Sequence, residues 1–271
     1  MGQDSDPDGA VSIGILTHVQ AAGGYNGAMS PSGASPGRFI TTHWSLIAAA
    51  RDGEAAQAQA ALADLCRAYW YPLYAYIRRQ GHAADEAQDL TQEFFARLLE
   101  KDFLATLDPE KGKFRSFLLT ACKHFLVNER ERAHAQKRGG GRPSVSLDFG
   151  DAEARYGREP GHSLSADRLF ERRWALDLLQ GVLTRLREEH VARGKGPLFD
   201  RLRAFLVGER QAGGYTRAAA DLGLTEGAVK VAVHRLRQRY RELLREEIGR
   251  TVDDPADIDG EIRALFGALA P

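Results

Sequence analysis

Hydrophobic residues recur at intervals of three and four in two long parts of the chain, from Thr42 to about Arg138 and again after Leu169. This spacing places them on one face of an α-helix. The stripes of the first part are Leu62, Leu65, Tyr69, Leu73, Tyr76 and Ile77; then Ala87, Leu90, Phe94 and Leu98; then Phe114, Phe117, Leu118, Ala121, Phe125 and Leu126. No run of β-branched residues alternating with polar ones predicts a strand. The pattern predicts an all-α fold, with a kink or a new helix at Pro72.

Two stretches show no such period and divide the chain. Residues 1–41 are rich in Gly, Ser, Pro and Ala, which predicts a disordered leader with a second candidate translation start at Met29. Residues 139–165 have a similar composition and predict a flexible linker. We therefore expect two small helical domains, 42–138 and 166–248. A C-terminal tail, 249–271, should contain a short amphipathic helix, which we expect to cap the second domain.

The charge is balanced overall but segregated along the chain. The 271 residues include 37 basic and 37 acidic ones. Nevertheless, residues 111–142 hold nine bases against two acids, and residues 225–241 hold five bases against one acid. Two separated basic blocks indicate two contacts with a polyanion, unless both are simply solvated helix faces.

The second basic block lies in a segment with helix-turn-helix spacing, residues 215–244. Ala219 is small enough for two helices to cross closely, Gly223 suits a turn with positive φ, and Val229 can pack back on the first helix. Thr225 is a natural N-cap for the second helix. Such a helix fits the major groove of DNA, where basic side chains reach guanine edges and phosphates. Its candidate DNA-binding residues are Thr225, Glu226, Lys230, His234, Arg235 and Arg237.

The first basic block mixes aromatic and basic residues, as surfaces that bind unpaired DNA often do. Phenylalanines at helical spacing are more often core, and we expect Phe117 and Phe125 to be buried. Upstream, the helix predicted over 85–100 has a polar face that contains Asp85, Asp89 and Glu93. Phosphate would be repelled by that face, whereas a basic protein surface would be attracted. A plainer explanation is the favourable placement of acids at a helix N-terminus.

Three motifs together resemble a known family. They are "DEAQDLTQEFFARL", "GKFRSFLLTACKHFLVNERERA" and, after the linker, "YTRAAADLGLTEGAVKVAVHRLRQRYRELL". The chain resembles a bacterial sigma-70-type RNA polymerase sigma factor, of the small two-domain extracytoplasmic-function group, over about 42–138 and 166–248. The resemblance implies a region 2-like bundle and a region 4-like helix-turn-helix domain.

The resemblance also implies partners and sites. Core RNA polymerase would bind through its β′ clamp helices to Asp89, Gln92, Glu93 and Phe94. The first domain would read and melt the −10 promoter element through Lys113, Arg115, Lys123, His124, Asn128 and Arg132. The second domain would read the −35 element with the helix that starts at Thr225. An anti-sigma protein is a possible further partner.

This chain departs from the family pattern in places that limit the inference. His124 stands where Asn is usual, Asn128 where Asp is usual, and Ala228 where Thr is usual. The polar stretch 187–198 replaces a short turn. The promoter sequences therefore do not follow from the resemblance.

Other functions are less well supported by the sequence. A stand-alone helix-turn-helix regulator remains the alternative, but it would not require an acidic docking face. An enzyme would need clustered carboxylates for a metal or a nucleophile with its base, and neither pattern is present. Cys66 and Cys122 lie too far apart to indicate a zinc site or a disulfide framework. We expect no cofactor, no metal, no small-molecule substrate, no membrane span and a cytoplasmic location.

Overall fold

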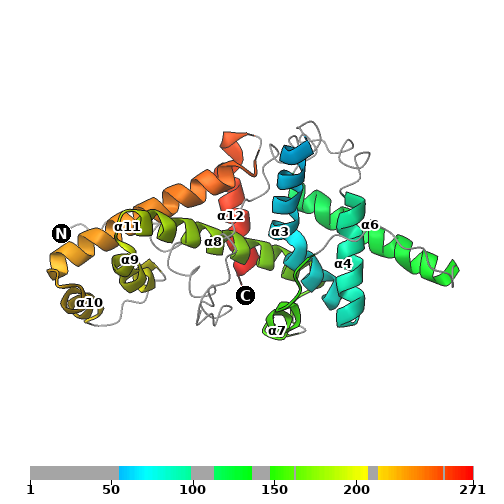
Figure 1. Ribbon diagram of the computed structural model, residues 1–271, viewed down its shortest axis with the longest axis horizontal. Coiled ribbons are helices and arrows are strands. Elements are labelled where there is room, and N and C mark those ends of the chain that lie inside the picture. Colours follow the sequence, from blue (N-terminus) through cyan, green and yellow to red (C-terminus); the bar gives the residue numbers. More distant parts are fainter. Residues whose placement is uncertain are drawn as a thin grey trace. The chain divides into compact units, whose positions relative to one another are not determined.

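The computed structural model describes residues 55–98, 113–135, 147–161, 163–206, 213–252 and 254–270 (Figure 1). Every regular element among them is helical, which confirms the all-α fold. The elements are α3 (Ala55–Arg79), α4 (Ala84–Leu98), α6 (Phe114–Ala135), α7 (Ala152–Tyr156), α8 (Ala166–Ala192), α9 (Gly196–Leu202), η2 (Arg203–Leu206), α10 (Gly214–Leu222), α11 (Glu226–Gly249), η3 (Pro255–Asp257) and α12 (Ile258–Leu269). The predicted leader and Met29 lie outside the described residues.

The chain divides into two compact units. Among the described residues, the α3 unit comprises those within 39–177 and 248–268, and the helix-turn-helix unit comprises those within 178–247 together with 269 and 270. The second unit therefore begins within α8, whereas the sequence predicts a domain that starts at residue 166. Residues 166–177 of that helix belong to the α3 unit.

The centre of the α3 unit is the second half of α3. Every residue from 71 to 77 is buried, so this segment has no polar face. The helix continues through Pro72 instead of starting anew there. Tyr69 packs edge-on against Phe114 of α6, with ring centroids 5.6 Å apart. A helix buried on all sides must be covered by several neighbours, and α4, α6 and α7 belong to the same unit.

Part of the predicted linker packs against this central helix. The ring of Phe149 lies 5.3 Å from that of Trp70, centroid to centroid. In α7, Glu153 pairs with Arg78 at 2.7 Å. The hydroxyl of Tyr71 donates to Glu159 at 2.7 Å. These contacts differ from the flexible chain that the composition predicts for 139–165, because buried partners on α3 offset the entropy of ordering a Gly-rich segment.

Two buried cysteines also belong to this unit. Cys66 of α3 and Cys122 of α6 are both unpaired thiols with little or no exposed surface. Burial raises the pKa of Cys66 to about 12 and also raises the pKa of Cys122.

The C-terminal tail forms the predicted short helix but in a different place from the one we expect. Residues 248–268 belong to the α3 unit, not to a cap on the helix-turn-helix unit. The buried face of α12 contains Leu265, which is fully buried, and Glu261, which is 1% exposed. A carboxylate at such a position requires cationic partners.

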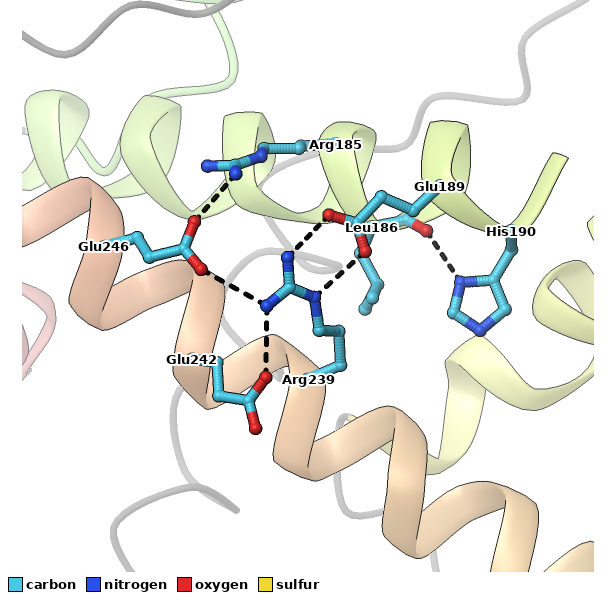
Figure 2. Close-up of polar contacts among 7 residues, drawn as sticks. All are labelled: Arg185, Leu186, Glu189, His190, Arg239, Glu242 and Glu246. Carbon is cyan, nitrogen blue, oxygen red and sulfur yellow. Dashed lines mark hydrogen bonds and ion pairs between the residues drawn. The ribbon is translucent and has the colours of Figure 1, made fainter. Parts of the chain in front are cut away.

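Within the helix-turn-helix unit, one arginine connects α8 and α11. Figure 2 shows Arg239 of α11 pointing at Glu189 of α8, to which it donates two hydrogen bonds of 2.8 and 2.9 Å. Arg239 also contacts Glu242 and Glu246 of its own helix, at 3.0 and 3.2 Å. Glu246 in turn pairs with Arg185 at 2.7 Å. The network fixes the pairing of the two helices, since a bidentate guanidinium–carboxylate contact is geometrically specific.

The polar stretch 187–198 forms the last turns of α8, which ends at Ala192, the connecting turn, and the start of α9 at Gly196. Gly194 has a φ of 69°, and the amide of Lys195 donates to the carbonyl of His190 at 2.8 Å, which closes the end of α8. Pro197 lies at the first turn of α9, where a missing amide hydrogen does no harm.

Candidate nucleic-acid interface

The turn between α10 and α11 has the geometry that the sequence predicts. Gly223 adopts a φ of 63° at the end of α10, and the amide of Leu224 donates to the carbonyl of Ala219 at 2.9 Å. The hydroxyl of Thr225 accepts a hydrogen bond from the amide of Ala228 at 3.2 Å, which caps α11.

Small and branched side chains hold the two helices together. Ala218 and Ala219 of α10 are buried, as are Val229 and Val233 of α11. Small residues on α10 allow a close approach, and the valines fill the space between the helices. The N-terminal half of α11 therefore has one face fixed in the core and the other exposed.

The exposed face of α11 carries a mixture of cationic and apolar groups. His234 and Arg235 are exposed, and neither has an ion-pair partner within the part of the chain that the structure describes. Val231 between them and the cap is 51% exposed. Cationic and apolar side chains on a protruding helix can contact phosphates, base edges and thymine methyl groups.

Two other predicted residues of this face are engaged with each other. Glu226 pairs with Lys230 at 2.7 Å and accepts a hydrogen bond from Thr216 at 3.0 Å. The hydrogen bond from Lys230 lowers the pKa of Glu226, and the pKa of Lys230 is raised in return. The pair connects the start of α11 to α10, while both side chains stay at the surface.

Arg237 differs from the prediction. Its guanidinium donates to the carbonyl oxygen of Phe205 at 2.7 Å, which ties α11 to η2. The Phe205 ring stacks on Tyr215 with centroids 4.8 Å apart. Arg237 is therefore directed into its own unit, where it satisfies a backbone carbonyl at a helix end.

In the α3 unit, the outer face of α6 holds several of the residues expected at the −10 element. His124 and Asn128 are exposed, and Val127 between them is 51% exposed. Arg132 is exposed but pairs with Glu129 at 2.9 Å. Lys123 pairs with Asp167 at 2.7 Å. Both ion pairs are at the surface, where exchange for a phosphate costs little.

The start of α6 departs from the prediction. Arg115 is buried, with its guanidinium 4.1 Å from the centre of the Trp174 ring and 2.8 Å from Glu171. It also pairs with Glu261 of α12. Lys113 pairs with the same carboxylate but remains 42% exposed. Desolvation lowers the pKa of Lys113, with Arg115 contributing in the same direction. Arg115 therefore stabilises the unit instead of facing DNA.

The predicted docking face of α4 is only partly exposed. Asp89 is exposed and has no ion pair among the described residues. Gln92 and Glu93 are half-buried, and Glu93 pairs with Arg97 at 2.6 Å. Phe94 is 3% exposed and packs against Phe125 of α6, so it supports the face from below and does not itself lie on it. Of the two phenylalanines expected in the core, Phe125 is buried and Phe117 is half-buried.

Sequence reasoning missed two residues that shape these surfaces. Arg97 connects Glu93 to Glu129 of α6 and lies over the Phe125 ring at 4.7 Å. Glu261 of α12 forms ion pairs with Lys113 and Arg115, although it is distant from both in sequence. The available signal for Glu261 was its position, because it falls on the same helical stripe as Leu265 and Leu269.

Other kinds of site find no support in the described residues. Among them, no group of three or more His, Cys, Asp or Glu side chains could hold a metal ion. None of the helices described is both long and apolar enough to cross a membrane.

Comparison with protein-family models gives a match to sigma-70 region 2 over residues 65–135. The matched residues begin in α3 and end with α6, so they include the acidic face of α4 and the outer face of α6. No curated protein and no solved structure matches the chain.

Proposed function

We infer that the chain directs promoter-specific initiation by bacterial RNA polymerase. The match of residues 65–135 to sigma-70 region 2 bears out the resemblance to sigma-70-type sigma factors. A region 2 supplies a role in polymerase binding and promoter recognition. We assign the chain to the small two-domain extracytoplasmic-function group, with −10 contacts in the α3 unit and −35 contacts in the helix-turn-helix unit. The region 2 match is the observation that carries this proposal.

The two exposed surfaces of the α3 unit support a division of labour within region 2. Asp89 and Glu93 give α4 an acidic face that suits a basic protein surface, here the β′ clamp helices of the polymerase. On α6, the exposed His124 and Asn128 can hydrogen-bond to bases. Unpairing and unstacking the bases of the duplex costs a few kcal/mol per base, so the polymerase must contribute further contacts.

The helix-turn-helix geometry supports the −35 assignment, which the family match does not reach. A capped helix with a fixed inner face and an exposed cationic outer face is the arrangement that enters a major groove. Arg235 and His234 are the side chains most available for base and phosphate contacts.

A pull-down with core RNA polymerase tests the proposal. We expect full-length wild type to bind stoichiometrically, and Asp89→Lys and Glu93→Lys to lose at least about tenfold in affinity, because each places a cation against a basic partner surface. Asp89→Lys is the cleaner variant, since Glu93→Lys also leaves Arg97 beside a like charge.

The matched control is Glu188→Lys, which makes the same charge change at an exposed position in α8 outside region 2. Its binding should equal that of wild type. If wild type binds DNA but not polymerase, the chain is instead a stand-alone helix-turn-helix regulator. An equal loss of polymerase affinity in Asp89→Lys, Glu93→Lys and Glu188→Lys would mean that net charge, and not the face of α4, determines binding.

A further inference from the structure

The C-terminal helix α12 places a carboxylate inside the α3 unit. Glu261 is 1% exposed, and its two oxygens pair with different cations, Oε1 with Arg115 and Oε2 with Lys113. Neighbouring Leu265 is fully buried, so α12 is anchored by apolar contacts as well as by charge. A buried carboxylate with two cationic partners is a specific contact, because removal of either side leaves an unpaired charge in the interior.

Both cations stand at the N-terminal end of α6, within the region 2 match. Arg115 is fully committed to protein partners, since it also contacts Glu171 and the Trp174 ring. Lys113 is different, because its ammonium group remains 42% exposed and can be reached from solvent. A phosphate oxygen and a carboxylate oxygen can each accept a charge-assisted hydrogen bond from an ammonium group.

The tail has the same sign of charge as a nucleic-acid backbone. Asp254, Asp257, Asp259 and Glu261 fall within one short stretch, and the next base is Arg263. Burial and the charge of Arg115 lower the pKa of Lys113, whereas the charges of Glu171 and, less strongly, Asp257 raise it. Within the tail, Glu261 contacts the cation that a phosphate would need, and Asp257 acts on it through its charge.

α12 is not part of region 2 itself. The matched residues end at Ala135, more than a hundred residues before α12 in the sequence. The helix is therefore a segment outside the region 2 match that packs onto the same unit.

We propose that α12 is a built-in competitor of DNA: Glu261 occupies Lys113 at the start of α6, and a DNA phosphate binds there only by displacing it. This inference rests on the proposed DNA-binding role of region 2. Occupation of Lys113 by Glu261 makes the free protein bind DNA weakly. Release of α12 is then a step in promoter binding.

Fluorescence anisotropy with a forked DNA of arbitrary sequence tests the competition, since a phosphate contact does not depend on sequence. We expect full-length Glu261→Gln to bind roughly fivefold more tightly than wild type near 0.1 M salt, the size of about one added phosphate contact. The gain should disappear when Lys113→Ala is added to Glu261→Gln.

Glu171→Gln is the matched control. It makes the same change in net charge and removes a partner of the same Arg115. The charge of Glu171 also acts on Lys113, but Glu171 forms no ion pair with Lys113 among the described residues, lies on α8 and leaves α12 untouched. Its DNA affinity should change by less than about twofold. Equal gains for Glu171→Gln and Glu261→Gln, or a gain that survives Lys113→Ala, would overturn the competition.

Hydrogen exchange on wild type supplies a measurement that needs no variant. The amides of residues 258–268 should be protected in the free protein and lose protection when the same DNA is bound in the presence of core polymerase. Unchanged protection with DNA bound would show that α12 stays in place, and would overturn this inference while leaving the sigma-factor proposal intact. If neither DNA nor polymerase binds, both fail together.

Discussion

Individual arginines in this chain lie in different environments, although their sequence surroundings are similar: some are exposed, and others bind groups within the protein. Arg235 is exposed and has no acidic partner among the described residues, while Arg237, two positions later, bonds to the carbonyl of Phe205. Arg115 and Arg239 are also engaged within the protein, where each pairs with carboxylates. A count of basic residues therefore overstates how much positive charge a DNA molecule can meet.

Arg235→Ala should weaken binding of the polymerase complex to its preferred promoter by about 1–3 kcal/mol, the usual value of a base or phosphate contact by arginine. The promoter can be obtained by selection from random DNA, and affinity measured by filter binding.

Arg241→Ala is the control for Arg235→Ala. Arg241 is also exposed on α11 but lies beyond the N-terminal half of the helix. Its removal should cost less than about 0.5 kcal/mol. Similar losses for both variants would mean that α11 meets DNA through general charge and not through this face.

At the scale of elements, the α10–α11 turn depends on one backbone conformation. Gly223→Ala should lower the free energy of unfolding by about 1 kcal/mol, because an alanine at a φ of 63° is strained. No atom lies within 4 Å of the added Cβ, so the cost comes from the backbone alone. Urea denaturation measures it.

Gly227→Ala makes the identical chemical change four residues later, in the first turn of α11. There φ is that of a helix and the space is also open, so the variant should be more stable than wild type by about 0.5 kcal/mol. A destabilised Gly227→Ala would contradict the helical assignment at the start of α11.

The α8–α11 pairing predicts a dependence on pH. The hydrogen bonds from Arg239 lower the pKa of Glu189 in the folded protein. This carboxylate therefore contributes stability above its unfolded pKa, near 4.5, and the contribution is lost as pH falls through the folded pKa. Glu189→Gln should be less stable than wild type at pH 7, and the difference should shrink toward pH 3.

Urea midpoints at several pH values provide the measurement, with Glu188→Gln as control. Glu188 is exposed, adjacent in sequence and without an ion pair among the described residues. Its variant should follow the wild-type pH curve. A constant deficit for Glu189→Gln at every pH would show that packing, and not charge, sets the effect.

The sequence predicts helices better than it predicts what surrounds them. The apolar stripes locate α3, α4 and α6, and Gly223 with Thr225 locates the turn. Periodicity cannot show that residues 71–77 are buried on every side, because that depends on neighbours from other parts of the chain. Composition likewise fails at residues 147–161, whose order comes from contacts such as Tyr71 with Glu159.

The candidate site shows the same division. Exposed residues such as Asp89, His124 and Arg235 lie on the predicted faces, since helical spacing determines them. Arg115 is different, because its partner Glu261 lies 146 residues away in sequence. No local pattern at residue 115 could indicate that contact.

At the scale of the whole molecule, the balance of charge has a physical meaning. The chain carries no net charge, so attraction to DNA depends on where its charges are exposed. Ion pairs of Lys113, Arg115 and Lys123 within the α3 unit neutralise part of the basic block. The full chain should therefore show weak and strongly salt-dependent DNA binding before polymerase is added.

The two buried thiols make this chain well suited to labelling chemistry. The sequence has only Cys66 and Cys122, and both are buried and hard to ionise. Maleimides react with the thiolate, so neither native cysteine competes at neutral pH. A cysteine introduced at the exposed Arg263 of α12 would take up a fluorophore selectively, and its emission would then report directly on the position of the C-terminal helix.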